Sequence, residues 1–179
     1  MTGRPPSQVR DYVASRHGAA LGARLRRLSE RIDREAQSIY AQFGVKFEQR
    51  WFGVMNQLDL KGALRVGDLA AALGISHAAV SQIRGRLVRA GYVSQKPDRE
   101  DARTTRLSLT PSGVRLVAKL RPLWTALDVV SENLNREAGD AVTVIARVEA
   151  GLDKASLWAR VKPVLERAAS RADRTEPPT

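Results

Sequence analysis

Residues 66–113 of this chain read VGDLAAALGIS-HAAVSQIRGRLVRAG-YVSQK-PDREDAR-TTRLSLT-PSG. The first part predicts two short helices, over residues 67–73 and 77–90, because apolar residues recur at helical spacing on both sides of a break. Gly74 allows a sharp turn at this break, and the hydroxyl of Ser76 can cap the second helix. Two helices joined in this way are typical of a helix-turn-helix.

The second of these helices has one apolar side and one small, polar side. Val80, Ile83 and Leu87 fall on the apolar side, so we expect them in the core. The opposite side and its edges carry His77, Ala78, Ser81, Gln82, Gly85, Arg86 and Arg89. Such a surface suits a helix that enters the major groove of DNA, where Gln82 can pair with adenine through two hydrogen bonds. An ordinary solvated helix face has a similar composition, so this segment alone leaves both interpretations open.

A pair of strands is expected next, over residues 92–96 and 104–109, because both segments alternate and contain β-branched residues. Residues 97–103 connect them. Arginines at the tip of a hairpin, here Arg99 and Arg103, can enter the narrow, electronegative minor groove. Asp101 can pair with a nearby arginine and hold the tip in shape. Helix, turn, helix, strand, charged tip and strand together predict a winged helix-turn-helix, in a mainly α chain with a small β-hairpin.

Upstream of this segment, two further helices are expected. Apolar residues at steps of three, four and seven define one face of the first, which ends near Gly44; they are Leu21, Leu25, Leu28, Ile32, Ile39 and Phe43. The second is expected to carry an apolar side made of Phe47, Trp51, Val54, Met55 and Leu58.

Downstream, Thr110 and Pro111 favour the start of a helix, because threonine can cap it and proline suits its first position. Its apolar stripe is broader than one small domain needs, which indicates burial against a second copy of the chain; the stripe comprises Val114, Leu116, Val117, Leu120, Leu123, Trp124, Leu127 and Val130. Gly139 and Gly151 are expected to bracket another helix. A last helix is expected over about residues 154–169, with a kink at Pro163.

These expectations divide the chain into four parts. Residues 1–17 form a flexible N-terminal arm, residues 18–45 and 114–170 a helical dimerisation region, residues 46–113 a winged helix-turn-helix DNA-binding domain, and residues 171–179 a disordered tail.

The charge of the chain indicates a polyanionic partner. The 179 residues include 30 Lys and Arg against 19 Asp and Glu, a formal net charge of +11. Ten basic residues and only three acidic ones lie between residues 84 and 121, so the excess gathers where a DNA duplex would lie. A charge that serves solubility alone is the simpler alternative.

Several function classes are disfavoured by what the sequence lacks. It contains no cysteine, which excludes disulfides and thiolate metal sites, and its two histidines are too few for a metal cluster. No cofactor and no metal are therefore expected. No catalytic residues are predicted either, since no Ser/His/Asp set, phosphate-cradling glycine loop or paired His/Glu ligands occur. No apolar run could span a bilayer or serve as a signal peptide, so a cytoplasmic protein without a membrane partner is expected.

The central motifs resemble those of the MarR family of bacterial transcriptional regulators. The match consists of G-Y-V at 91–93, D-R-E-D-A-R at 98–103 and L-S-L-T-P-S-G at 107–113, and V-S-Q-I-R-G-R-L at 80–87 looks like the recognition helix of the family. The resemblance extends over roughly residues 21–152. It implies an obligate homodimer, held by its N- and C-terminal helices, that binds a pseudo-palindromic operator of double-stranded DNA, commonly as a repressor in the bacterial cytoplasm and nucleoid.

The resemblance also implies roles for individual residues. Arg103, steadied by Asp101, is the minor-groove reader of such proteins. The full set expected to contact DNA is Ser76, His77, Ala78, Ser81, Gln82, Arg86, Arg89, Arg99, Asp101 and Arg103. An architectural winged-helix protein that binds phosphates with little sequence preference is the alternative function, because it would share this basic surface.

Many regulators of this family release DNA when a small aromatic or anionic effector enters a crevice between the dimer helices and the DNA-binding lobe. The residues expected there are Tyr40, Phe47, Trp51, Phe52 and Met55. Each of them could equally fill an ordinary core. The lack of cysteine excludes the thiol-oxidation mode of sensing, and the role of the helix after Leu152 stays open.

Overall fold

A computed structural model of the chain describes residues 11–98, 100–101 and 103–172. Most of the expected arm (residues 1–10), Arg99 at the tip of the wing, and residues 173–179 of the expected tail lie outside the described residues. The chain divides into two compact units, residues 1–119 and residues 120–179. The boundary falls inside a long helix.

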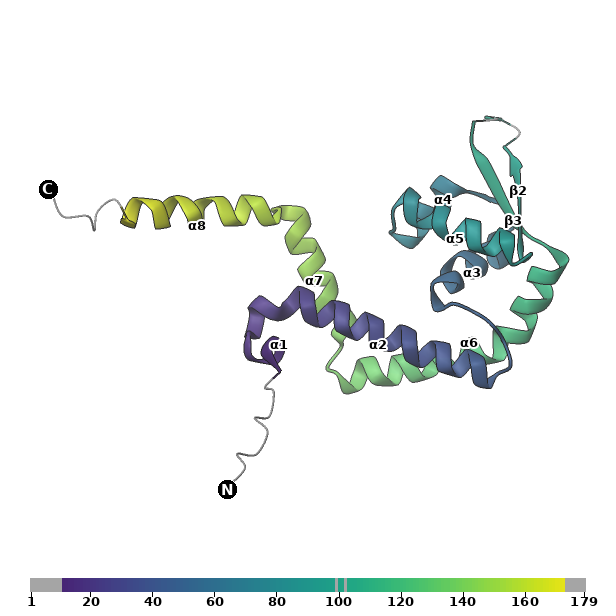
Figure 1. The fold of residues 1–179 in the computed structure, drawn as a ribbon, viewed down its shortest axis with the longest axis horizontal. Coiled ribbons are helices and arrows are strands. Elements are labelled where there is room, and N and C mark those ends of the chain that lie inside the picture. The colour runs from purple at the N-terminus through teal and green to yellow at the C-terminus, as the bar shows by residue number, and fades with distance from the viewer. Residues whose placement is uncertain (1–10, 99, 102, 173–179) are drawn as a thin grey trace, which may run out of the picture. The chain divides into compact units, whose positions relative to one another are not determined.

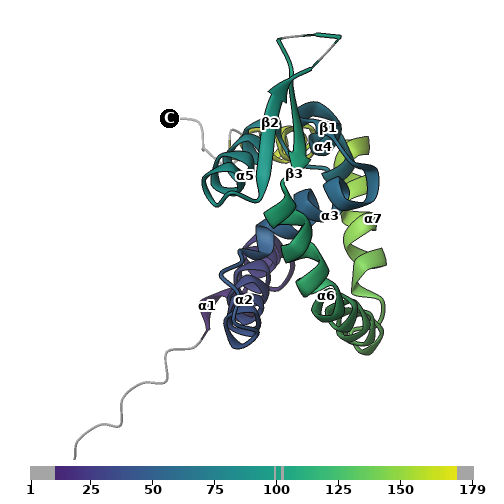
Figure 2. The same cartoon turned by 90° about the vertical axis from the view of Figure 1, so that its right-hand side faces the viewer.

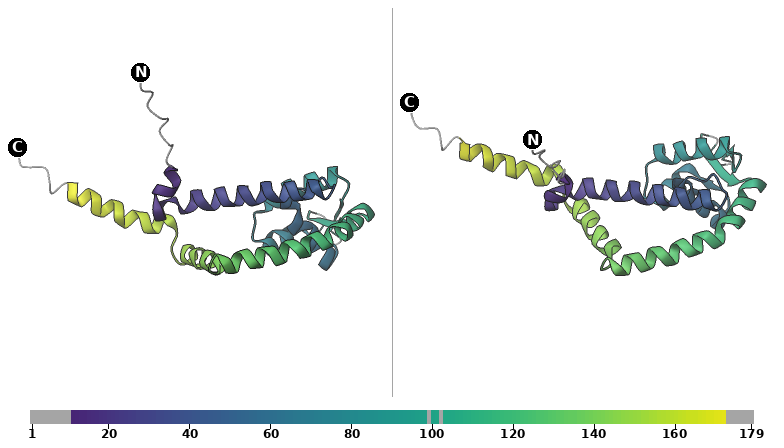
Figure 3. Two further views of the ribbon diagram at one scale, coloured as in Figure 1. Left: turned by 90° about the horizontal axis from the view of Figure 1, so that it is seen from below. Right: turned by 60° about the horizontal axis from the view of Figure 1, so that its bottom comes forward.

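The first unit begins with a short helix, α1 (Tyr12–Ser15), a 3₁₀ turn (His17–Ala20) and the long helix α2 (Leu21–Gln42). Figure 3 shows α2 as one uninterrupted helix. Arg27 on α2 donates to the carboxylate of Asp11 at 2.6 Å, so the described end of the arm is tied to this helix. The expected stop at Gly44 is confirmed, since Gly44 has a φ of +68° that most other residues avoid.

The apolar face expected on α2 lies mostly in solvent. Leu21, Leu25, Leu28, Ile32 and Phe43 are all exposed, and Ile39 is half-buried. The side chains of α2 that are buried are those of Ala36 and Tyr40, in the second half of the helix. The long apolar stripe therefore has no cover within the described chain.

The second expected helix is shorter than the sequence indicates. A 3₁₀ turn (Gln49–Trp51) leads into α3 (Phe52–Lys61), and Phe47 precedes both, in an extended segment. The prediction of a helix through Phe47 was wrong because a helical spacing of aromatic residues also fits a loop that folds its rings inward. Tyr40, Phe47 and Trp51 pack ring to ring, with centroids 4.7 Å and 5.6 Å apart, and Trp51 also contacts Tyr92.

The helix-turn-helix is confirmed as α4 (Val66–Leu73) and α5 (His77–Arg89). Gly74 ends α4 in the left-handed conformation, with a φ of +63°, and Ser76 caps α5 by accepting a hydrogen bond from the amide of Ala79 at 3.1 Å. Val80, Ile83 and Leu87 of α5 are buried as expected, and on α4 Leu69 and Ala70 are buried while Leu73 is half-buried. Figure 1 shows α3, α4 and α5 gathered at the base of a projecting hairpin.

The hairpin is formed by β2 (Val93–Pro97) and β3 (Thr105–Leu109), which pair antiparallel with Val93 opposite Leu109 and Pro97 opposite Thr105. A two-residue strand, β1 (Leu64–Arg65), pairs with the other edge of β3, so the sheet has the order β1-β3-β2. Figure 2 shows the hairpin rising beyond α4 and α5. The sequence indicated the hairpin but not β1, because two residues are too few for a recognisable alternation.

The helix after the wing, α6 (Pro111–Glu137), begins where Thr110 and Pro111 predict. The hydroxyl of Thr110 accepts from the amide of Gly113 at 3.0 Å and donates to the carbonyl of Gly91 at 2.6 Å. Gly113 itself lies against the chain before β2: a Cβ atom there would stand 2.1 Å from the carbonyl oxygen of Tyr92. The T-P-S-G motif therefore joins the start of α6 to the end of the helix-turn-helix.

The second unit contains the rest of α6, then α7 (Ala141–Lys154) and α8 (Leu157–Ala172). Gly139 precedes α7 as expected, but Gly151 lies inside α7, and α8 starts after Ser156, which caps it. α8 continues through Pro163 as one helix in Figure 3 and reaches residue 172, so residues 171 and 172 of the expected tail are helical. No described side chain of α7 or α8 is buried.

In the part of the chain that the structure describes, no helix is both long and apolar enough to cross a membrane.

Candidate nucleic-acid interface

The outer surface of α5 is open, as the sequence predicts for a helix that reads DNA. His77, Ala78, Gln82, Arg86 and Arg89 are exposed, and Ser81 is half-buried. The exposure follows from the burial of Val80, Ile83 and Leu87 on the other side, which fixes how the helix is rotated. Ser76 differs from the rest, because its hydroxyl already serves as the helix cap.

One residue of this set is engaged by a partner that the sequence did not indicate. The guanidinium of Arg86 donates to the carboxylate of Glu48 at 2.6 Å, and Arg50 stands 3.3 Å from the same carboxylate. Glu48 belongs to the extended segment before α3, and its contact with Arg86 places its carboxylate beside α5. The guanidinium of Arg86 is therefore partly occupied within the chain, whereas Gln82 and Arg89 are exposed and form no ion pair with another described residue.

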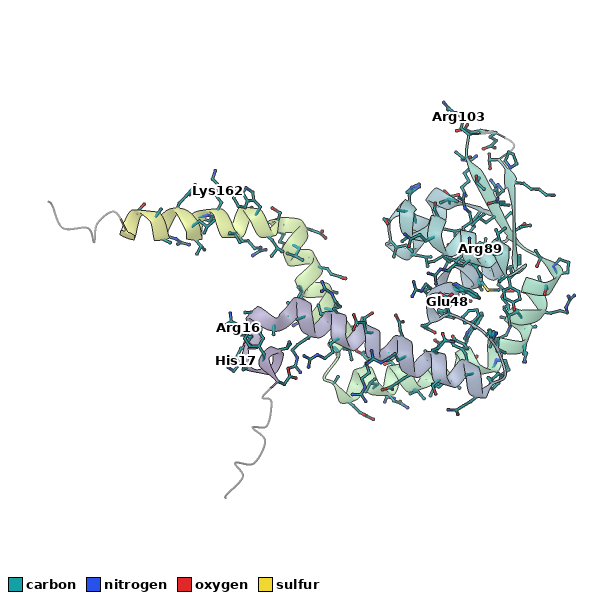
Figure 4. The ribbon with its side chains drawn as sticks, in the orientation of Figure 1. Arg16, His17, Glu48, Arg89, Arg103 and Lys162 are labelled. Atoms are coloured by element: carbon teal, nitrogen blue, oxygen red, sulfur yellow. The ribbon has the colours of Figure 1, made fainter. Side chains whose placement is uncertain are left out.

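The wing tip presents Arg103 to solvent. Its side chain is 91% exposed and lies at the far end of the hairpin in Figure 4. The Nε of Arg103 donates to Asp101 Oδ1 at 3.0 Å, and the backbone amide of Arg103 donates to the same oxygen at 3.1 Å. Thr104 closes the turn by donating its amide and its hydroxyl to the carbonyl of Asp101, both at 2.9 Å. Asp101 thus holds Arg103 in an outward position at the tip.

Below the tip, Asp98 anchors the base of the wing. Its side chain is 1% exposed and accepts from Arg65 at 2.8 Å and 3.1 Å and from Arg106 at 2.9 Å. The amides of Glu100 and Asp101 also donate to it. Arg65 additionally contacts Glu100 at 2.6 Å, and Arg106 donates to the carbonyl of Ala63 at 2.9 Å. The wing is therefore tied to the residue that precedes α4.

These contacts fix the charge state of the anchor. The guanidinium of Arg65, followed by that of Arg106 and the amide of Glu100, holds the pKa of the Asp98 carboxyl well below its ordinary value. Hydrogen bonds to the carboxylates of Asp98, first, and of Glu100 raise the pKa of Arg65. Asp98 is therefore ionised at neutral pH, as a buried carboxylate with two arginine partners should be.

The anchor was missed from the sequence, where Asp98 counted only as an acid in a basic loop. A signal was present, because an aspartate directly after a strand and next to a proline is well placed to accept backbone amides in a turn. Its arginine partner Arg65, however, lies 33 positions away. Arg106 also donates to the carboxylate of Asp98. Part of the basic excess counted over residues 84–121 is therefore neutralised within the protein.

The residues expected to line an effector crevice lie together, but mainly as core. Tyr40, Phe47, Trp51 and Met55 are buried, and Phe52 is half-buried. The hydroxyl of Tyr40 donates to Gln49 at 2.8 Å. The indole N–H of Trp51 is buried without a hydrogen-bond partner among the described residues. Among all the residues that the structure describes, no group of three or more His, Asp or Glu side chains is arranged to hold a metal ion.

Comparison with known proteins shows what this interface and its fold are similar to. Residues 43–104 match the model of the MarR family. The S. aureus MepR–DNA complex matches with a TM-score of 0.60 at 18% identity, over 74% of this chain and 97% of MepR. A mutant of E. coli MarR complexed with operator DNA matches with a TM-score of 0.58 at 20% identity, over 74% of this chain and 93% of that one.

A third solved structure, of a MarR family transcription regulator, is 26% identical, with a TM-score of 0.56 over 73% of this chain and 88% of the other. The curated proteins contain no match to this chain. The resemblance carried by the motifs is confirmed: residues 43–104 match the model of the MarR family, and the chain has the fold of the MarR-family transcription regulators.

Proposed function

We propose that this chain is a sequence-specific regulator of transcription, a repressor, that binds a pseudo-palindromic operator in double-stranded DNA as a homodimer. The observation that carries the proposal is the pairing of two readers on one unit. The open, polar surface of α5 suits the major groove, and Arg103, oriented by Asp101 at the wing tip, suits the adjacent minor groove. The similar fold of the MepR–DNA complex and of the E. coli MarR mutant complexed with operator DNA supports the same partner here.

The test compares an operator with random duplexes over a range of salt concentrations. The operator would first be isolated by selecting bound duplexes from a random pool. If a dimer makes on the order of 6–10 phosphate contacts, affinity for either duplex should fall roughly 10³–10⁵-fold between 50 and 200 mM salt. We expect the operator to keep a large advantage over random DNA at every salt concentration. Equal affinity for all duplexes would contradict the proposal and favour an architectural protein.

The proposal of a homodimer rests on apolar surfaces that are exposed to solvent in the described part of the chain. The helices outside the winged helix-turn-helix form its dimerisation region in this proposal. On α2 the exposed stripe runs along one face from Leu21 to Ile32. In the second unit the large exposed apolar residues include Val130, Leu134, Val142, Leu157, Trp158 and Leu165. Apolar faces of this extent are unusual on a monomer and commonly mark an interface.

A charged residue in the stripe of α2 should therefore dissociate the dimer. Leu28→Glu is expected to shift the protein from dimer to monomer in sedimentation velocity, because a carboxylate would be buried without a partner at the interface. Leu28 is 51% exposed in the single chain, so the fold should tolerate the change. Gln37→Glu is the matched control: Gln37 is exposed on the opposite side of the same helix, nine positions on. A Leu28→Glu protein that remains dimeric would contradict the role of this stripe.

An effector is proposed only for the region around Trp51. The indole N–H of Trp51 is buried without a hydrogen-bond acceptor among the described residues, and a small aromatic or anionic molecule would supply one. The neighbouring aromatic rings lack no such partner, because they already pack against one another.

A further inference from the structure

A basic cleft of about 300 Å³ lies between the first turn of α4, the start of α5 and the wing. Three arginines and a histidine line it, together with two threonines of the wing; they are Arg65, His77, Arg84, Arg103, Thr104 and Thr105. Of these, only His77 and Arg103 belong to the surface expected from the sequence to contact DNA. The cleft therefore extends that surface into the space between the recognition helix and the wing.

Arg84 is the unbalanced charge of this cleft. Arg65 is neutralised by Asp98 and Glu100, and Arg103 pairs with Asp101. Arg84 is half-buried, yet within the described ranges no acidic side chain comes within ion-pair distance of it. A partly desolvated guanidinium without a counter-charge is unfavourable, and its five donors fit the oxygens of a phosphate or carboxylate.

The walls of the cleft are built by specific residues. A Cβ atom at Gly67 would lie 3.3 Å from Cε1 of His77, so the glycine lets the imidazole lie close against the first turn of α4. The carboxylate that also lines the cleft, Asp68, accepts from the backbone amide of Arg65 at 3.4 Å and makes no ion pair with Arg84. Thr104 is held in place by its hydrogen bonds to the carbonyl of Asp101.

We propose that this cleft holds one backbone phosphate of the bound DNA, with Arg84 as its principal ligand. The proposal rests on the proposed function. A helix in the major groove and an arginine in the neighbouring minor groove must be separated by one sugar-phosphate strand, and the cleft lies between α5 and Arg103, where that strand would pass. Arg84 thus positions the duplex between the two readers and carries no base preference.

The test replaces the charge of Arg84 and measures the dependence of DNA affinity on salt. Arg84→Gln is expected to lower the slope of log Kobs against log salt by about 0.9 for each protomer, because one phosphate contact is lost per half-site. Affinity should fall for operator and random duplexes alike, so the ratio between them should not change. Arg34→Gln is the matched control, since Arg34 is an exposed arginine of α2 that forms no ion pair among the described residues, and it should leave the slope unchanged.

A second arm locates the phosphate. In operator duplexes with one neutral methylphosphonate at a time, wild-type protein should lose affinity at one position in each half-site where the Arg84→Gln variant loses nothing further. Thermal unfolding of the variant should match that of the wild type, which excludes a folding defect as the cause of weaker binding.

The outcomes separate this inference from the proposed function. An unchanged slope and unchanged methylphosphonate profile in Arg84→Gln, with operator preference intact in the wild type, would overturn the inference alone. Equal wild-type affinity for operator and random duplexes would instead contradict the proposed function, and the slope on random duplex would still test Arg84. Binding of inorganic phosphate that depends on Arg84, without any change in the DNA slope, would assign the cleft to a free anion and overturn the DNA phosphate.

Discussion

Gly113→Ala is expected to destabilise the winged-helix unit by about 1–3 kcal/mol or more, the usual cost of forcing an extra group into a packed site. The new Cβ would meet the carbonyl oxygen of Tyr92 at 2.1 Å. That oxygen cannot simply move away, because it accepts the amide of Thr110 at 3.0 Å. Relief of the clash therefore requires the start of α6 to separate from the end of the helix-turn-helix.

Thermal and urea unfolding, followed by circular dichroism, would measure this loss. Gly22→Ala is the control, since Gly22 also lies in the first turn of a helix and a Cβ there meets nothing within 4 Å. The control should be neutral or slightly stabilising, because alanine favours a helix more than glycine does. If Gly113→Ala unfolded like the control, the close approach of α6 to Tyr92 would be refuted.

The largest loss of DNA binding is expected from Arg103→Ala. The side chain makes no contact that the fold needs apart from its pairing with Asp101, and it is almost fully exposed. Its removal should leave the unfolding temperature unchanged. A minor-groove contact of the strength usual for a specific arginine contributes roughly 1–3 kcal/mol, and a dimer loses two of them. Affinity for the operator should therefore fall by roughly two or more orders of magnitude.

Fluorescence anisotropy with a labelled operator would measure this effect, with Arg34→Ala as the control for the loss of one positive charge. Asp101→Ala should give a smaller loss than Arg103→Ala, because it frees the arginine without removing it. An Arg103→Ala protein that binds the operator as tightly as the wild type would contradict the role of the wing tip as a reader.

What the sequence could predict was set by short-range chemistry. Gly74, Ser76 and Thr110 act on residues within a few positions of themselves, so the turn, the cap of α5 and the start of α6 were correctly predicted. The rotation of α5 followed from the spacing of its apolar residues. Asp101 and Arg103 are two positions apart, and their pairing was likewise expected.

The features that escaped prediction depend on residues distant in the chain. Asp98 meets Arg65 across 33 positions and Arg86 meets Glu48 across 38, and neither pairing has a periodicity that a sequence could display. The sequence predicts that a helix ends at Gly151, but α7 continues past this residue, and Arg160 donates to the carbonyls of Gly151 and Ala155. Spacing locates a helix more reliably than it locates its last residue.

The absence of any buried side chain in the described parts of α7 and α8 has a thermodynamic consequence. The two helices have 14 and 16 residues, and isolated helices of this length are only marginally stable in water. Their helical state therefore depends on whatever covers their apolar side chains. If a second copy does so, the folding of this part of the chain is linked to subunit concentration by mass action. Dilution would then melt the C-terminal helices as it separates the subunits, which makes the abundance of the protein in the cell a determinant of its structure.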